Sequence, residues 1–220
     1  GDFGFSFRYF APVTDVIRTR IGYTLVLVVT TLLLTYLIAI PVGVYSAVRQ
    51  YSAGDYALTL LGYVGLAIPN FLLALILLYV SATVFDTSVG GMFTPGMEKV
   101  PWSLDKVVDL LRHLWVPVLV LCISGTAFQI RVMRAVMLDE LGKLYVTAAR
   151  ARGVPARQLL MKYPVRVAIN PLVSTIGWDL SAIVSGAPIV ALVLAIPDMG
   201  PLFLDALRDQ DMYLAGTLLL

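Results

Sequence analysis

Long uncharged, apolar blocks alternate along this chain with short charged segments. The uncharged blocks run over residues 21–48, 56–85, 113–130 and 167–197, and the last of them is interrupted only by Asp179. An α-helix rises 1.5 Å per residue, so about 20 residues cross the roughly 30 Å hydrocarbon core of a bilayer. Each block is therefore predicted to be a membrane-spanning helix, and the apolar segment from residue 212 is predicted to start another.

Prolines occur inside these blocks, at Pro41, Pro69, Pro117, Pro171 and Pro188. In a membrane bundle, neighbouring helices and polar side chains satisfy the backbone groups that a proline frees. These prolines are therefore not evidence against helical structure in the blocks.

Composition supports the membrane interpretation and excludes several other classes. Of the 220 residues, 59% are hydrophobic and only 14% are charged, and the mean hydropathy is +0.87. Soluble domains carry about 25% charged residues. A net charge of +2 is too small to indicate a nucleic-acid partner. Cys122 is the only cysteine and His113 the only histidine, so we predict no metal site. No nucleophile with a positioned base is evident, so we predict no catalytic residue, and we predict no cofactor site.

Basic residues gather between the third and fourth blocks. In residues 131–166 they are Arg131, Arg134, Lys143, Arg150, Arg152, Arg157, Lys162 and Arg166, against Asp139 and Glu140. Lysine and arginine favour the cytosolic side of a membrane, so this loop and the turn at 49–55 should face the cytosol. The loops at 86–112 and 198–211 then face outward, in a multi-pass protein of the cell membrane.

The cytosolic loop has a regular pattern of its own. Apolar spacing places Leu141, Leu144, Tyr145, Ala148 and Arg152 on one face of a helix. Gly153 is suited to end that helix, and Pro155 is suited to the first turn of the next. The loop is therefore predicted to be a helix, a sharp turn and a second helix.

The run YVTAARARGVPARQLLMKYPVRVAINP resembles the cytosolic signature of ABC importer permeases, in which two alanines are followed four residues later by a glycine. Here these are Ala148, Ala149 and Gly153. Tyr145 and Val146 before them, and the ARARG run, resemble the branch that imports dipeptides, oligopeptides and nickel. The opening GDFGFSFRYFAPVTDVIRTRIGYTL resembles the segment that follows the first membrane helix in that branch.

This resemblance implies an all-α integral membrane fold, a polytopic helical bundle of the type I importer kind. Residues 1–220 would form one permease domain, as a fragment that lacks the first helix and the end of the last. The loop at 131–166 would hold a coupling helix that docks on a separate ATPase subunit. The docking residues implied are Tyr145, Ala148, Ala149, Arg150, Arg152 and Gly153. Each arginine could instead serve membrane topology or contact anionic headgroups.

The resemblance also implies partners. They are a second permease subunit in a heterodimer, two ATP-binding subunits, an extracytoplasmic substrate-binding protein and the lipid bilayer, with no nucleic acid. The sequence contains no G-x-x-x-x-G-K-[ST] phosphate loop. ATP would therefore be bound by a partner, and this chain would be a transport subunit rather than an enzyme, forming half of a pathway for peptides.

Asp179 is the one charge inside the fourth block. A carboxylate in a membrane is costly and normally faces the bundle interior or a wet cavity. It could line the translocation path or serve as a structural hydrogen-bond acceptor, and the sequence leaves both open. For the whole chain, the alternatives are a permease of the same branch for nickel or another small solute, an ATP-independent secondary transporter, and a membrane scaffold.

Overall fold

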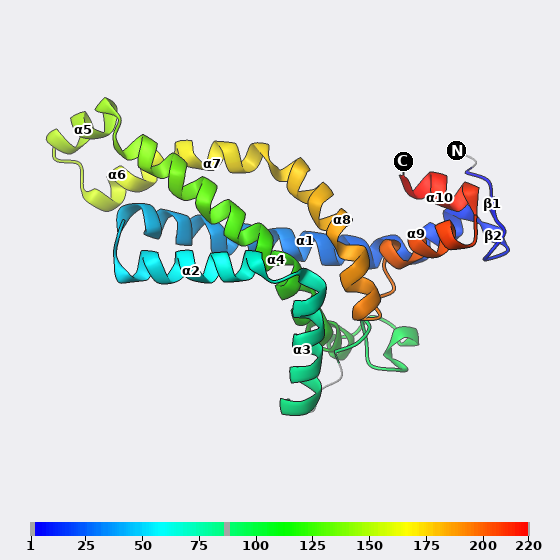
Figure 1. Cartoon of the computed structure of the whole chain (residues 1–220). Helices are drawn as coiled ribbons and strands as arrows, with labels where there is room; N and C mark the ends of the chain where they lie inside the picture. Colours follow the sequence, from blue (N-terminus) through cyan, green and yellow to red (C-terminus); the bar gives the residue numbers. More distant parts are fainter. Residues whose placement is uncertain (1–2, 86–88, 220) are drawn as a thin grey trace. The chain divides into compact units, whose positions relative to one another are not determined.

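The computed structural model describes residues 3–85 and 89–219. The remaining residues of the predicted domain 1–220, and with them the start of the predicted outer loop 86–112, lie outside this description. The fold is almost entirely helical, as predicted (Figure 1). The α-helices are α1 (Val13–Val48), α2 (Ala53–Ala67), α3 (Asn70–Val84), α4 (Leu104–Leu141), α5 (Leu144–Ala151), α6 (Ala156–Lys162), α7 (Pro164–Ser174), α8 (Ile176–Val193), α9 (Met199–Arg208) and α10 (Met212–Leu219). A short 3-10 helix, η1 (Met97–Lys99), lies before α4.

The chain divides into two compact units, and helices α1, α4 and α8 each contribute to both. The first unit consists of Gly1–Thr31, Pro69–Leu121 and Ser181–Leu220, and the second of Leu32–Ile68 and Cys122–Leu180. Each unit has its own apolar core, so each is described by itself.

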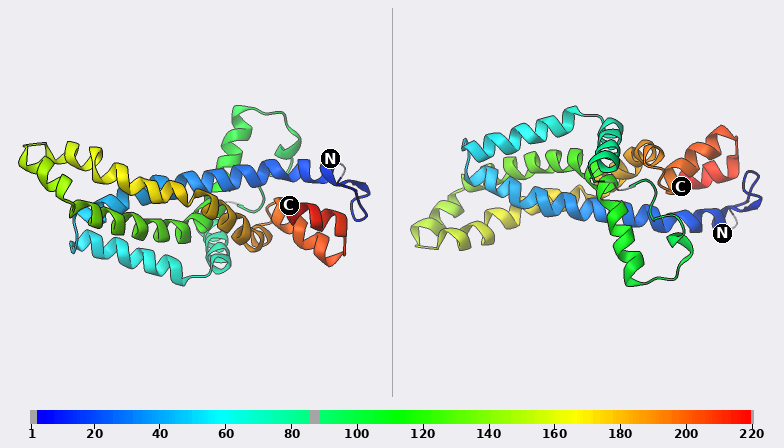
Figure 2. Two further views of the ribbon diagram at one scale, coloured as in Figure 1. Left: turned by 90° about the horizontal axis from the view of Figure 1, so that it is seen from above. Right: turned by 90° about the horizontal axis from the view of Figure 1, so that it is seen from below.

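In the second unit, α2 and α7 lie alongside the parts of α1 and α4 that belong to it, as the views in Figure 2 show. Two glycines allow close approach: a Cβ atom at Gly43 would lie 2.6 Å from Cβ of Met133, and one at Gly65 would lie 2.5 Å from Cγ2 of Ile123. The buried core comprises Ala47, Met133, Met137, Val165, Ala168 and Leu172. Small residues thus let α4 pack tightly against α1 and α2.

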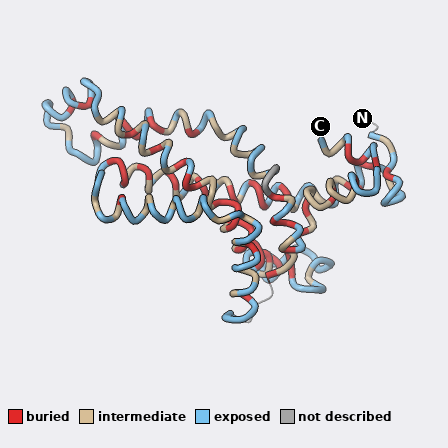
Figure 3. The backbone as a smooth tube through the Cα atoms, viewed as in Figure 1, coloured by how far each residue is buried: buried red, intermediate tan, exposed pale blue. Residues whose placement is uncertain are grey.

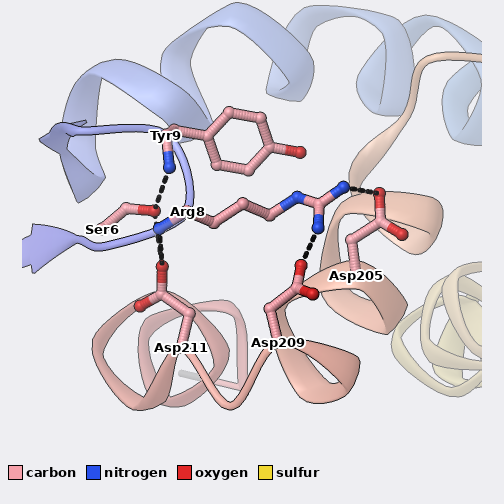
Figure 4. A network of polar contacts seen from close by, with 6 residues as sticks. All are labelled: Ser6, Arg8, Tyr9, Asp205, Asp209 and Asp211. Carbon is pink, nitrogen blue, oxygen red and sulfur yellow. Dashed lines mark hydrogen bonds and ion pairs between the residues drawn. The ribbon is translucent and has the colours of Figure 1, made fainter.

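The first unit contains a two-stranded antiparallel hairpin, β1 (Phe5–Ser6) and β2 (Ala11–Pro12), just before α1. The hairpin is joined to the end of the chain by polar contacts (Figure 4): Ser6 Oγ donates to Asp211, and Arg8 pairs with Asp209 and Asp205. The core beneath consists of Val13, Val16, Leu202, Ala206, Leu214 and Ala215. The start of α1 is therefore held against α9 and α10.

Three helices among the described residues are long and apolar enough to cross a membrane, namely α1, α4 and α8. The predicted spans 21–48 and 113–130 lie within α1 and α4. The predicted span 167–197 is divided between α7 and α8, and of these two helices only α8 is long and apolar enough to cross a membrane. Helix α10 begins at Met212, where a further span was expected to start.

The block at 56–85 is not one continuous helix. Helix α2 ends at Ala67 and α3 begins at Asn70, and the two make a fourth span only if this bent pair is counted as one. The break lies at Pro69: the preceding Ile68 is extended, with φ −87° and ψ 121°, which is the conformation that a following proline favours. Pro41, Pro117, Pro171 and Pro188 lie inside helices.

Candidate functional site

The predicted cytosolic loop contains the helix, turn and helix that its sequence indicates, although α4 first continues through residues 131–141. Helix α5 is closed by Arg152, whose N–H donates to the Ala148 carbonyl at 3.1 Å. Gly153 follows with φ +79°, a left-handed conformation that suits glycine. Pro155 is the residue before α6 rather than part of its first turn. A tight turn thus joins two short helices.

The two short helices pack on each other through Val146, Ala149 and Leu159, which are 0%, 7% and 3% exposed. The apolar face that carries Leu144 and Tyr145 points outward: Leu144 is 87% exposed and Tyr145 is 40% exposed. The covered side of α5 is the one that packs against α6, through Val146 and Ala149.

Five of the six predicted docking residues are therefore accessible, while Ala149 is buried on the side of α5 that faces α6. Figure 3 shows α5 as mostly exposed, with a buried stretch inside it. The accessible docking residues are Tyr145, Ala148, Arg150, Arg152 and Gly153. We call this set, together with Leu144, the α5 surface. It combines two guanidinium groups, two small residues and two exposed side chains with apolar surface, those of Leu144 and Tyr145.

Tyr145 is held in place at the edge of the α5 surface. Its hydroxyl donates to the Glu140 carboxylate at the end of α4, and its ring lies 6.1 Å from that of Tyr163. The hydrogen bond to Glu140, and then partial burial, raise the pKa of Tyr145 to about 12. The phenol thus stays protonated at neutral pH and links α5 to α4.

A buried ion pair lies elsewhere in the second unit. Arg134 on α4 donates from Nε to Asp55 Oδ1 at 3.2 Å and from Nη2 to Oδ2 at 2.9 Å. Asp55 is 3% exposed and also accepts from the Tyr51 backbone N–H. Sequence reasoning assigned Arg134 to topology and overlooked Asp55. The signal was present, since an aspartate at the edge of an apolar block needs a partner when it is buried.

Asp179 lies at the centre of a polar cluster in the second unit. Its Oδ2 accepts hydrogen bonds from the Tyr36 hydroxyl and from Gln129 Nε2, the latter at 2.6 Å. Gln129 also donates to Thr175 Oγ1 at 3.2 Å, and the Tyr36 hydroxyl lies 2.9 Å from the Leu172 carbonyl. The cluster therefore ties α1, α4 and the α7–α8 junction together, and the structural role left open by the sequence is present.

Tyr36, Gln129 and Thr175 are functional candidates that the sequence interpretation missed. Gln129 is 0% exposed and its Oε1 accepts no hydrogen bond from the described residues. A buried amide inside an uncharged block is a usable signal, because polar groups in a membrane seek one another. Only the fold shows which partners they find.

Metal ligation has no support among residues 3–85 and 89–219, where no three His, Cys, Asp or Glu side chains gather as a metal site. His113 is 5% exposed, and its Nδ1 lies 2.8 Å from the Asp109 carbonyl. This imidazole is satisfied by its own helix.

Apolar helices of membrane-spanning length, a part-buried polar cluster between such helices and an exposed helix–turn–helix are together typical of a membrane permease. Residues 39–220 match the family described as binding-protein-dependent transport system inner membrane component, and the chain belongs to that family. It is a membrane component of a transport system rather than a catalytic subunit. The resemblance read from the sequence is confirmed.

Relatives match along the whole chain. The oligopeptide transport system permease protein AppB of Bacillus subtilis is 35% identical over 222 residues, covering 100% of this chain and 69% of the relative. A putative peptide permease protein of Brucella ovis is 37% identical over 224 residues, with 100% and 68% covered. The oligopeptide transport system permease protein OppB of Escherichia coli K12 is 26% identical, with 100% and 68% covered.

Proposed function

We propose that this chain is the membrane-spanning subunit of an ATP-driven importer and forms half of the translocation pathway for dipeptides or oligopeptides. The family supplies the transport role, and three relatives named as peptide or oligopeptide permeases support the substrate class. No residue of the described chain favours nickel or another small solute over a peptide, so peptides remain the substrate that we propose.

We further propose that the α5 surface docks on a separate ATPase subunit. The observation that carries this proposal is the packing of Val146 and Ala149 against α6, which leaves Tyr145, Ala148 and the two arginines accessible on a short, closed helix. Because this packing already fixes the helix, its backbone needs no further ordering when the outer side binds, and binding then costs less entropy.

The partners follow from this role. We propose that ATP is bound by two partner subunits, since the sequence contains no phosphate-loop motif. A second permease subunit, forming a heterodimer with this chain, would complete the pathway, and an extracytoplasmic binding protein would deliver the substrate. The protein would be a multi-pass protein of the inner membrane, with α5 and α6 in the cytosol.

The proposal is tested by peptide uptake into cells that express the full-length protein with its partner ATPase, and into cells that lack the ATPase. Uptake that persists without the ATPase would contradict the proposal. ATP-dependent uptake of nickel, without uptake of peptides, would show that the substrate is nickel and not a peptide.

A matched pair of glycine variants tests the α5 surface. Gly153→Val strains a left-handed residue by about 1–2 kcal/mol and should uncouple ATP hydrolysis from uptake. Gly142→Val is the control at the other end of α5, where a Cβ would make an ordinary contact, 3.6 Å from the Asp139 carbonyl oxygen. Equal loss of coupling in both variants would show that the turn at Gly153 has no specific role in coupling.

A further inference from the structure

Asp198 lies in the first unit, between α8 and α9, and only one oxygen of its buried carboxylate accepts a hydrogen bond from the described residues. The residue is 2% exposed, and Oδ1 accepts a hydrogen bond from the Gly200 N–H at 2.9 Å. Oδ2 is buried and accepts no hydrogen bond from any described residue. Burial raises the pKa of Asp198 to about 6, against the opposing effects of the Gly200 N–H and the charge of Arg20. A buried acceptor without a donor is costly unless something else supplies one.

Two cavities meet at Asp198. The larger is about 560 Å³, within the range of small-molecule sites. It is formed by parts of α1, α8, α9 and α10, and Asp198 is the only charged residue among the described residues that line it. The smaller is about 250 Å³ and includes Tyr9, Arg20 and Asp205. Asp198 thus lies at the wall of an apolar cavity, while Arg20 lines a different one.

The turn that carries Asp198 is fixed by its surroundings. Thr24 Oγ1 accepts a hydrogen bond from the Met199 N–H at 3.0 Å, which ties α1 to the start of α9. A Cβ atom at Gly200 would lie 2.6 Å from Cα of Pro188, so α9 begins in direct contact with α8. These contacts hold the carboxylate where it is.

We propose that the larger cavity binds a primary ammonium group on an apolar body, namely the free amino terminus of a peptide whose first side chain is apolar. This inference rests on the proposed function. An ammonium carries three N–H donors and a positive charge, which is what the unpaired Oδ2 of Asp198 lacks. The apolar wall, with Leu25, Val184 and Phe203, receives the side chain.

The charges around the site set a pH window for binding. Asp198 is ionised above about pH 6, and a peptide amino group is protonated below about pH 8. Arg20, Tyr9 and Asp205 line the smaller cavity, so no second titratable group among the described residues faces the larger one. Binding is therefore strongest between these two values and weakens as Asp198 is protonated.

The test is equilibrium binding to the full-length permease, assembled with its partner subunits in phosphatidylcholine nanodiscs. The probe is leucyl-alanine amide, and its N-acetyl derivative is the uncharged control. The amide should bind and the acetylated form should not. Asp198→Asn should weaken binding about 10- to 100-fold, the range of a charge-assisted hydrogen bond. Asp205→Asn, a carboxylate of the smaller cavity, should leave it unchanged.

A second variant tests the cavity in case Asp198→Asn fails to fold. Val184→Phe fills the larger cavity without changing charge and should also weaken binding. Equal affinity of the wild type and Asp198→Asn, or equal binding of the acetylated probe, would overturn the inference. Loss of binding when phosphatidylethanolamine replaces phosphatidylcholine would assign the site to a lipid headgroup and overturn the peptide assignment.

Uptake measured in parallel separates the two proposals. Peptide uptake by a wild-type assembly that does not bind the amide would overturn this inference alone. Absence of uptake for every peptide tested would overturn the proposed function, and with it the assignment of the ligand as a peptide.

Discussion

Arg134 and Asp55 form a bidentate ion pair between the C-terminal part of α4 and the first turn of α2, with both guanidinium hydrogen bonds at or below 3.2 Å. Arg134 is 27% exposed in its side chain and Asp55 only 4%. Breaking a buried pair from one side leaves an uncompensated charge, which costs more than the pair itself contributes.

Arg134→Ala should therefore lower the free energy of unfolding by about 3 kcal/mol, measured by thermal unfolding of the full-length protein in detergent. Arg131→Ala is the control: Arg131 is exposed and its contact is a guanidinium 6.0 Å from the Phe128 ring, worth below about 1 kcal/mol. The double variant Arg134→Gln with Asp55→Asn should cost less than the sum of its parts. Similar losses for Arg131 and Arg134 would contradict this account.

Ala148 and Ala149 are neighbours with opposite environments, and their glutamate variants should behave differently. Ala148→Glu places a charge on the exposed α5 surface, so uptake and co-purification with the ATPase should fall while thermal stability is unchanged. Ala149→Glu buries an unpaired carboxylate against Leu159, so it should destabilise the packing of α5 on α6 by about 2 kcal/mol or more.

Limited trypsin digestion distinguishes the two alanine variants. Cleavage at Arg150 and Arg152 should be faster in Ala149→Glu and unchanged in Ala148→Glu. Faster cleavage in both variants would mean that Ala148 also supports the packing of the loop.

Asp179 should tolerate an amide better than an apolar side chain. Asp179→Asn keeps an oxygen that accepts from Tyr36 and Gln129, whereas Asp179→Leu leaves both donors without an acceptor and should cost about 1–3 kcal/mol for each. Gly177→Ala is a control on the same helix, because a Cβ there meets nothing within 4 Å. Uptake and substrate-stimulated ATP hydrolysis report on a role in the path. Unchanged values in both Asp179 variants would exclude it.

Asp211 should make the first unit sensitive to acid. Burial by itself would raise the pKa of Asp211, but hydrogen bonds from Ser6 Oγ and from the Leu214, Arg8 and Phe7 N–H groups outweigh it and lower the pKa. An aspartate with a lowered folded pKa contributes stability above its unfolded value of about 3.9, and this stability is lost as pH falls through the folded pKa.

Asp211→Asn should remove that acid dependence. Unfolding midpoints measured in detergent between about pH 2 and 6 should fall less steeply in the variant than in the wild type. Asp209→Asn is the control, since Asp209 pairs with Arg8 on an exposed surface where ion pairs are worth about 0–1 kcal/mol. Equal slopes for wild type and Asp211→Asn would show that the hydrogen bonds around Asp211 do not control the acid transition.

The local sequence around a proline does not predict whether the helix continues through it. Pro41 and Pro117 lie inside continuous helices, whereas Pro69 separates α2 from α3. All three interrupt the backbone hydrogen bonding in the same way. Whether the helix continues depends on what neighbouring segments supply, which the residues beside each proline do not reveal.

Helix α5 and the turn after it likewise combine one feature that the local sequence predicts and one that it does not. The end of the helix at Gly153 was predictable, because a left-handed turn residue has a strong local preference. The buried side of α5 was not, because eight residues carry too short a pattern and α6 decides which side is covered.

By itself the sequence determined that this protein is a helical membrane protein and where its turn glycine and the carboxylate within its fourth apolar block lie, because these depend on the length of uncharged segments and on local backbone preference. The permease family was indicated by the resemblance of the cytosolic loop and the flanking chain to that family. Only the tertiary structure decided that Asp179 meets Tyr36, 143 positions away, that Asp55 meets Arg134, and that Asp198 lies between two cavities. These contacts join helices far apart in the chain, and the packing of those helices sets them.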